Sequence, residues 1–185
     1  MLLELNEALL EGEPQTLSMM AREGQLTCLT GGTPERRLRW MEAMMGFVPI
    51  VHGYVSIDGE PLTPATADSF RQLMTFAPSE LSALGQVRTY DAPSVQDIFS
   101  LQANRSRPIS NGILGEEMRR VGIADDAQAR LIAVAVLLGK AILLVSQPPA
   151  GAFDYLLRQA RQGKTVIVSS TDAAFLTGAD LVVEI

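Results

Sequence analysis

The stretch from Gln25 to Leu38, which reads QLTCLTGGTPERRL, decides how the chain folds. Its first six residues form an apolar run typical of a buried strand, and Gly31 and Gly32 end that run. Pro34 then suits the first turn of a helix, which apolar residues at helical spacing continue as far as Met45. A strand that passes through a glycine turn into a helix predicts an α/β fold.

The rest of the chain alternates in the same way. Strands are predicted at 17–20, 54–57, 73–77, 141–145, 165–169 and 181–185, and helices at 36–45, 127–138 and 153–162. Between about 85 and 126, helical pieces at 95–101 and 113–121 are separated by polar loops, which indicates a small helical insert. The alternation favours a mostly parallel sheet with helices on both faces. The 185 residues fit a single domain, 1–185, that carries this insert.

The composition is that of a globular protein, and it argues against several functions. Hydrophobic residues make up 47% of the chain and charged residues 19%. The formal net charge of −6 argues against nucleic-acid binding, because such proteins usually carry a basic surplus. Two basic clusters, at 36–39 and 119–120, are interpreted as solvated helix faces. No signal peptide or membrane span is expected, since Gly139 and Lys140 interrupt the longest apolar run.

Cys28 and His52 offer little chemistry. Cys28 is the only cysteine and lies within an apolar run, so we interpret it as a small buried hydrophobe in a reducing compartment. His52 is the only histidine, which leaves a zinc site without enough ligands, and we expect it to lie in a loop. The sequence therefore predicts no metal site and no histidine-based catalysis.

The order of these elements, together with several framework residues, resembles the ATP-binding-cassette (ABC) ATPase family. The run 141–145 resembles the Walker B strand, and 165–168 resembles a closing strand. The matching framework residues are Gly24, Gly46, Gly53, Asp58, Gly59, Pro148, Asp154, Ala179 and Asp180. The resemblance covers almost the whole chain. It implies the three-layer fold of P-loop NTPases, with a mostly parallel sheet, N-terminal antiparallel strands and a small helical insert.

The segment that matches the family's phosphate loop departs from the pattern that binds a triphosphate. Such a loop needs glycines, a lysine for the phosphates and a serine or threonine for magnesium. Gly31 keeps the first glycine, but Arg36 stands at the second glycine position and Arg37 replaces the lysine. Leu38 replaces the magnesium ligand, and Pro34 removes a backbone donor.

Two interpretations of this loop remain open. Gly31, Gly32, Arg36 and Arg37 could hold a phosphate or sulfate at the start of a helix. Alternatively, the loop is a connector whose arginines are solvated, and we favour this second interpretation. Glu35 also adds negative charge where a phosphate would lie. It predicts that Arg37→Ala leaves folding intact.

The other motifs that the resemblance places in the chain have also lost their reactive groups. Ser146 stands at the family's magnesium-binding Asp and Gln147 at its catalytic Glu, and glutamine cannot accept a proton from water. Ser79 replaces the Q-loop glutamine, and Thr171 replaces the switch histidine. We interpret Ser146 and Gln147 as a polar strand end and expect no catalytic residues.

Asp125 and Asp126 replace the two glycines of the family's signature motif. Two acids close to a triphosphate would repel it. At the start of the apolar helix that follows, the same acids are well placed to cap its backbone N–H groups. We therefore predict a capping role for this pair.

Three functions follow from these observations. The first is a non-catalytic ABC-type subunit that acts as a structural or regulatory partner of a second copy, of another ABC ATPase subunit or of a membrane permease. The second is a weak nucleotide binder, with ATP held without magnesium, although no cofactor is expected. The third is a small-anion module built on Arg36, Arg37 and Arg39. The expected location is the cytoplasm, peripheral to the inner membrane through a partner and without direct insertion.

Overall fold

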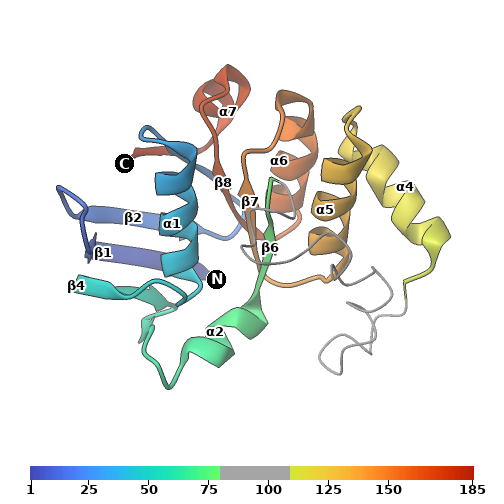
Figure 1. Ribbon diagram of the computed structural model, residues 1–185. Helices are drawn as coiled ribbons and strands as arrows, with labels where there is room; N and C mark the ends of the chain where they lie inside the picture. Colours follow the sequence, from blue (N-terminus) through green and yellow to red (C-terminus); the bar gives the residue numbers. More distant parts are fainter. Residues whose placement is uncertain (80–108) are drawn as a thin grey trace, which may run out of the picture.

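The strands of the computed structural model, which describes residues 1–79 and 109–185, form two separate sheets (Figure 1). The smaller sheet is antiparallel, with the order β2-β1-β4-β5. Its strands are β1 (Leu2–Leu10), β2 (Leu17–Arg22), β4 (Ile50–Ile57) and β5 (Glu60–Pro61). In β1 the pairing shifts around Glu7, which has a φ of 45°, so a bulge interrupts this strand.

The larger sheet is parallel and has the order β6-β7-β8-β3-β9. Its strands are β3 (Leu26–Thr30), β6 (Met74–Ala77), β7 (Ile142–Ser146), β8 (Thr165–Ser169) and β9 (Leu181–Glu184). Because all five run in one direction, their carboxyl ends lie at the same edge of the sheet, where sites in such folds are usually built.

The helices divide between the two faces of the parallel sheet. Helix α1 (Pro34–Met44) lies between the antiparallel strands and the parallel strands, and α4, α5 and α6 lie on the opposite side (Figure 1). The remaining helical bounds are α2 (Ala67–Leu73), α4 (Asn111–Val121), α5 (Asp126–Leu137), a 3-10 turn (Ala150–Ala152), α6 (Phe153–Arg161) and α7 (Ala173–Gly178). No helix in the described ranges is long and apolar enough to cross a membrane.

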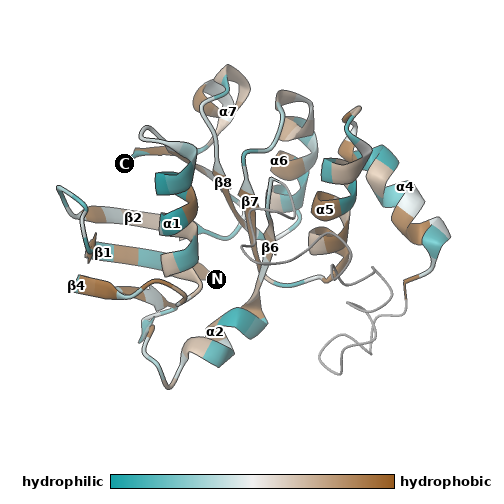
Figure 2. Ribbon diagram, viewed as in Figure 1, coloured by the Kyte–Doolittle hydropathy of each residue, from teal (hydrophilic) through white to brown (hydrophobic). Residues whose placement is uncertain are grey.

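Alternate residues of the central strands enter two separate cores. Leu29, Ile142, Leu144 and Ile167 pack on the side of α1, around the buried Trp40. The intervening residues Cys28, Leu143, Val145, Val166 and Val168 pack on the side of α5 and α6. A strand that is apolar on both faces reads as a continuous apolar run, and Figure 2 shows the central strands β7 and β8 coloured as hydrophobic.

Most of the predicted elements are present, and the predicted α/β class is confirmed. Strand β8 has the predicted bounds, and α4 lies at 111–121 within the expected insert and packs against α5. The helical piece expected at 95–101 lies outside the described residues, so the 85–126 insert stays a prediction. The expectation for His52 was wrong: it lies in β4, exposed and paired with Leu9 of β1, because β4 begins at Ile50.

Candidate functional site

The carboxyl ends of β3, β7 and β8 meet around one cleft of about 360 Å³. Its described lining residues are Arg37, Gln147, Pro148, Ser170, Thr171 and Asp172. Three of these, Arg37, Gln147 and Thr171, come from three separate motifs of the sequence. The fold therefore brings together residues that lie more than 100 positions apart in the chain.

The loop between β3 and α1 keeps its glycines for conformational reasons. Gly31 and Gly32 have φ values of 78° and 54°, in the left-handed region that glycine adopts readily. A Cβ on Gly31 would lie 2.9 Å from the carbonyl oxygen of Ile185, so a larger residue does not fit there. Thr33 then caps α1 by accepting a hydrogen bond from the Arg36 N–H at 3.2 Å, and Pro34 opens the helix.

The Arg37 side chain is buried and folds back onto this loop. Its Nη1 donates to the carbonyl oxygen of Gly31 at 2.7 Å and to that of Gly32 at 3.1 Å. The residue is only 3% exposed, and its Nε has no partner within the described residues. The expectation of a solvated arginine was therefore wrong, because the loop supplies two carbonyl acceptors to the guanidinium.

Arg36 points the other way, toward the connection between β1 and β2. Its Nε and Nη2 lie 2.6 and 2.5 Å from Oε2 of Glu13. The Glu13 side chain is only 5% exposed, and the Arg36 side chain is 27% exposed. The expectation of solvation is thus wrong for Arg36 as well, because a nearly buried carboxylate pairs with it.

Glu35 keeps a negative charge at the exposed start of α1. Hydrogen bonds from its own backbone N–H and from the Thr33 hydroxyl lower the pKa of its carboxyl, and the charge of Arg37 adds to this effect. An ionised carboxylate at a helix N-terminus is itself favourable. This carboxylate supplies the negative charge that an anionic ligand would otherwise bring to the N-terminus of α1.

The end of β7 is tied to its neighbours by backbone hydrogen bonds. Ser146 is buried, and its Oγ lies 3.5 Å from the Oγ of Ser169. Gln147 has a φ of 48°, donates its N–H to the Ser169 carbonyl at 2.9 Å and accepts a hydrogen bond from Gln128 Nε2 at 3.0 Å. The backbone of Gln147, rather than its side chain, makes these contacts.

Of the described cleft residues, Asp172 alone carries a negative charge. Its carboxylate is used as a helix cap, since it accepts a hydrogen bond from the Ala174 N–H at 2.8 Å. Thr171 beside it is exposed. Within residues 1–79 and 109–185, no three His, Cys, Asp or Glu side chains are grouped closely enough to hold a metal ion.

Several known structures share the arrangement of strands and helices seen in this chain. No protein-family model matches the chain. It aligns over its whole length with an ATP-binding subunit of an ABC transporter, with a TM-score of 0.74, 16% identity and 86% of that structure covered. A putative ABC transporter ATP-binding protein from Pyrococcus furiosus gives a TM-score of 0.73 at 13% identity, with 100% and 97% of the two chains covered. The chain has the ABC ATPase fold.

Two further similarities agree with this result. The cbiO1 structure from Clostridium perfringens, described as part of the ABC transporter complex cbiONQ, has a TM-score of 0.63 at 13% identity and covers 91% of this chain and 77% of its own. The arabinose import ATP-binding protein AraG of Pectobacterium atrosepticum is 26% identical over 133 residues, which are 71% of this chain. The chain spans about a quarter of AraG, since the match covers 25% of that protein.

In the ABC ATPase fold of this chain, the predicted capping role of Asp125 is confirmed. Its side chain accepts hydrogen bonds from the N–H groups of Ala127 and Gln128 at 2.9 and 3.1 Å. Sequence reasoning missed two residues that contact the predicted site segments: Glu13, which pairs with Arg36, and Gln128, which donates to the Gln147 carbonyl. Nothing local marks Glu13, because its partner Arg36 is 23 residues away. Gln128 closely follows Asp125 and Asp126, which stand at the glycines of the signature motif. This position in the sequence could have marked Gln128 as a candidate site residue.

Proposed function

We propose that the chain is a non-catalytic counterpart of an ABC transporter ATP-binding subunit and acts as a structural or regulatory partner. The observation that carries the proposal is the buried guanidinium of Arg37, which is bound to the carbonyl oxygens of Gly31 and Gly32. A phosphate-binding loop works by turning backbone N–H groups toward the ligand. Here two loop carbonyls face a cation of the chain itself.

The surroundings of Arg37 support the same proposal. Phosphoryl transfer needs a metal-binding acid and a group that positions the attacking water. Ser146 is buried and shares a hydrogen bond with Ser169, and the Asp172 carboxylate caps a helix. Gln147 can orient water but cannot take its proton. These residues fit a polar strand end better than a hydrolytic centre.

A protein partner is part of the proposal. The cbiO1 structure is described as part of a transporter complex, and AraG is an import ATP-binding protein. We infer that this chain associates with a second copy, with another ABC ATPase subunit or with a membrane permease. Its place would then be the cytoplasm, peripheral to the inner membrane through that partner.

The test is calorimetric titration of the purified chain with ATP, with and without magnesium. We expect no heat of binding at millimolar ATP in either case. Pyrophosphate and sulfate are titrated in parallel, and Arg37→Ala is compared with Arg130→Ala, which removes an exposed arginine from α5. Micromolar, magnesium-dependent ATP binding would overturn the proposal. Binding of all three anions that is lost only in Arg37→Ala would indicate an anion module instead.

A further inference from the structure

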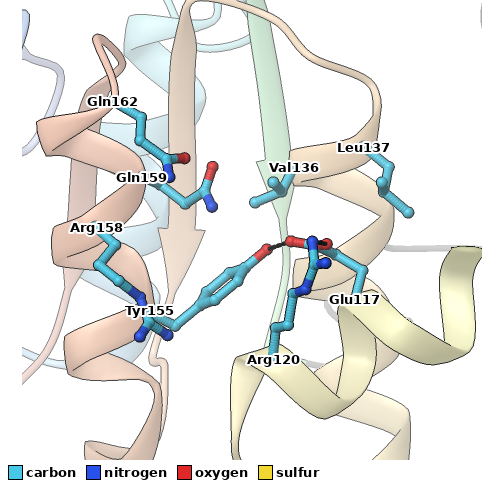
Figure 3. Close-up of a pocket in the computed structure, with 8 residues that line it drawn as sticks. All are labelled: Glu117, Arg120, Val136, Leu137, Tyr155, Arg158, Gln159 and Gln162. Carbon is cyan, nitrogen blue, oxygen red and sulfur yellow. Dashed lines mark hydrogen bonds and ion pairs between the residues drawn. The ribbon is translucent and has the colours of Figure 1, made fainter.

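A second cavity, of about 460 Å³, lies between α4, α5 and α6, and shares no described lining residue with the phosphate-loop cleft (Figure 3). Its volume is within the range of small-molecule pockets, on the order of 300–1,000 Å³. Glu117 and Arg120 reach it from α4, and Tyr155, Arg158 and Gln159 reach it from α6.

The inner part of this pocket is a closed hydrogen-bond network. The Tyr155 hydroxyl donates to Oε1 of Glu117 at 2.5 Å, and Arg120 Nη1 lies 3.1 Å from Oε2 of the same carboxylate. Tyr155 is 2% exposed and Glu117 is 8% exposed. Burial, followed by the hydrogen bond to Glu117, raises the pKa of the phenol, so Tyr155 stays protonated and remains a donor at neutral pH. Glu117 and Arg120 thus neutralise each other.

Gln159 is the polar group that this network leaves unused. The residue is only 8% exposed, and its carboxamide points from α6 into the pocket (Figure 3). It has no side-chain hydrogen bond within the described part of the chain. The fully buried side-chain atoms that lack a partner in the described ranges belong to Thr27, Arg37 and Trp40 and not to Gln159, so this carboxamide is open to the space of the pocket. A carboxamide placed in this way is therefore suited to a ligand.

Arg158 supplies the charge for such a ligand. Within residues 1–79 and 109–185 no acidic side chain forms an ion pair with it. Because Glu117 balances the charge of Arg120, Arg158 gives the described pocket residues a formal net charge of +1. Its guanidinium can bind a carboxylate or a phosphate with two parallel hydrogen bonds. Gln162 adds a second carboxamide, Val136 of α5 faces α6, and Leu137 is a further apolar lining residue from α5 (Figure 3).

We propose that this pocket binds a small molecule with one oxyanion group, either a carboxylate or a phosphate. The oxyanion pairs with Arg158, and the Gln159 carboxamide hydrogen-bonds a polar group next to it. The carbon skeleton lies against Val136 and Leu137. This site is separate from the phosphate-loop cleft, because no described residue lines both cavities.

The test is a titration of the ¹⁵N-labelled chain with sodium lactate, which has one carboxylate and a neighbouring hydroxyl, and, separately, with inorganic phosphate. The side-chain amide signals are followed by NMR, with the Gln159 pair assigned from its loss in Gln159→Leu. We expect at least one of the two anions to shift the Gln159 signals in a saturable manner. Arg158→Gln should weaken this binding roughly tenfold or more, as expected for loss of a charged hydrogen bond.

The matched control is Arg119→Gln, which removes an exposed arginine of α4 that does not line the pocket. Its affinity should equal that of the unmodified chain. Saturation by lactate alone would identify a carboxylate ligand, and saturation by phosphate alone would identify a phosphate ligand. The proposal is overturned if neither anion shifts the Gln159 signals, or if Arg158→Gln and Arg119→Gln bind equally well. Phosphate binding that depends on Arg37 and not on Arg158 would also overturn it.

Discussion

At the scale of single residues, Arg37 shows how one substitution changes the role of a loop. A lysine would place a mobile point charge in the cleft, whereas the planar guanidinium reaches two carbonyl groups at once. Its type and position were visible in the sequence. Its burial was not, because the turn of Gly31 and Gly32 that carries the two acceptors is formed only in the folded loop.

Because the Arg37 side chain is buried and bonded to two loop carbonyls, its removal should destabilise the protein, contrary to the expectation from the sequence that Arg37→Ala leaves folding intact. Arg37→Ala leaves the Gly31 and Gly32 carbonyls without their donor and opens a space beneath the loop. We expect a loss of about 1–3 kcal/mol in the free energy of unfolding. Urea denaturation measures it, with the exposed Arg130→Ala as control. If Arg37→Ala is as stable as Arg130→Ala, the guanidinium does not hold the loop.

The thiol of Cys28 gives a pH-dependent test of the core. Burial raises the pKa of this thiol to about 11, although a hydrogen bond with the backbone of Ser170 and the charge of Arg37 act against the shift. Above about pH 9, the unfolded chain releases the proton while the folded chain keeps it. The contribution of Cys28 to stability is therefore complete below that pH and is lost as the pH rises toward about 11.

Urea denaturation of the unmodified chain and of Cys28→Ala, at about pH 8 and about pH 10.5, isolates this contribution. Tyr155 titrates alike in both proteins and cancels from the comparison. We expect the unmodified chain to lose more stability than Cys28→Ala between the two pH values. Equal losses would mean that the thiol is not shielded from water in the folded protein.

At the scale of elements, the start of α5 depends on a single cap. Asp125 accepts two backbone hydrogen bonds there. Asp125→Ala should lower the free energy of unfolding by about 1 kcal/mol, whereas Asp125→Asn keeps an acceptor and should cost less. Thermal or urea denaturation of the two variants compares them directly. Equal destabilisation by both would show that the negative charge, and not the acceptor, stabilises the helix.

The elements that were predicted correctly are those whose secondary structure follows from the residue types within the segment itself. The run 165–169 is β-branched and buried on both faces, so its sequence alone indicates β8. Strand β1 was not located, because the bulge at Glu7 breaks the alternation of its apolar residues. Helix α2 was also missed, since its seven residues are too few to establish a helical period.

At the scale of the whole molecule, the candidate site depends on how the antiparallel sheet and the parallel sheet pack on the two sides of α1. The strand ends of the candidate site could be grouped from the sequence, because parallel strands bring their carboxyl ends to one edge. The contact of the antiparallel sheet with that edge could not be predicted. It depends on Glu13, which reaches Arg36 across the interface between the two layers.

The pair of Glu13 and Arg36 should therefore couple the antiparallel layer to the start of α1. Because the Glu13 side chain is 5% exposed and that of Arg36 is 27% exposed, loss of Arg36 leaves a nearly buried carboxylate without its partner. Loss of Glu13 instead leaves a guanidinium that can reach water. Arg36→Leu should thus destabilise the protein more than Glu13→Gln does, and the double variant should cost less than the sum of the two.

A double-mutant cycle by urea denaturation measures this coupling, and we expect about 0.5–3 kcal/mol. The Arg161 and Asp180 pair, which also joins distant segments but involves a more exposed arginine, is the comparison, and its coupling should be smaller. Additive effects of Glu13→Gln and Arg36→Leu would mean that the two layers are held together by their apolar contacts alone. Arg36 would then be free to engage an anion at the loop, which would favour the anion module over the non-catalytic subunit.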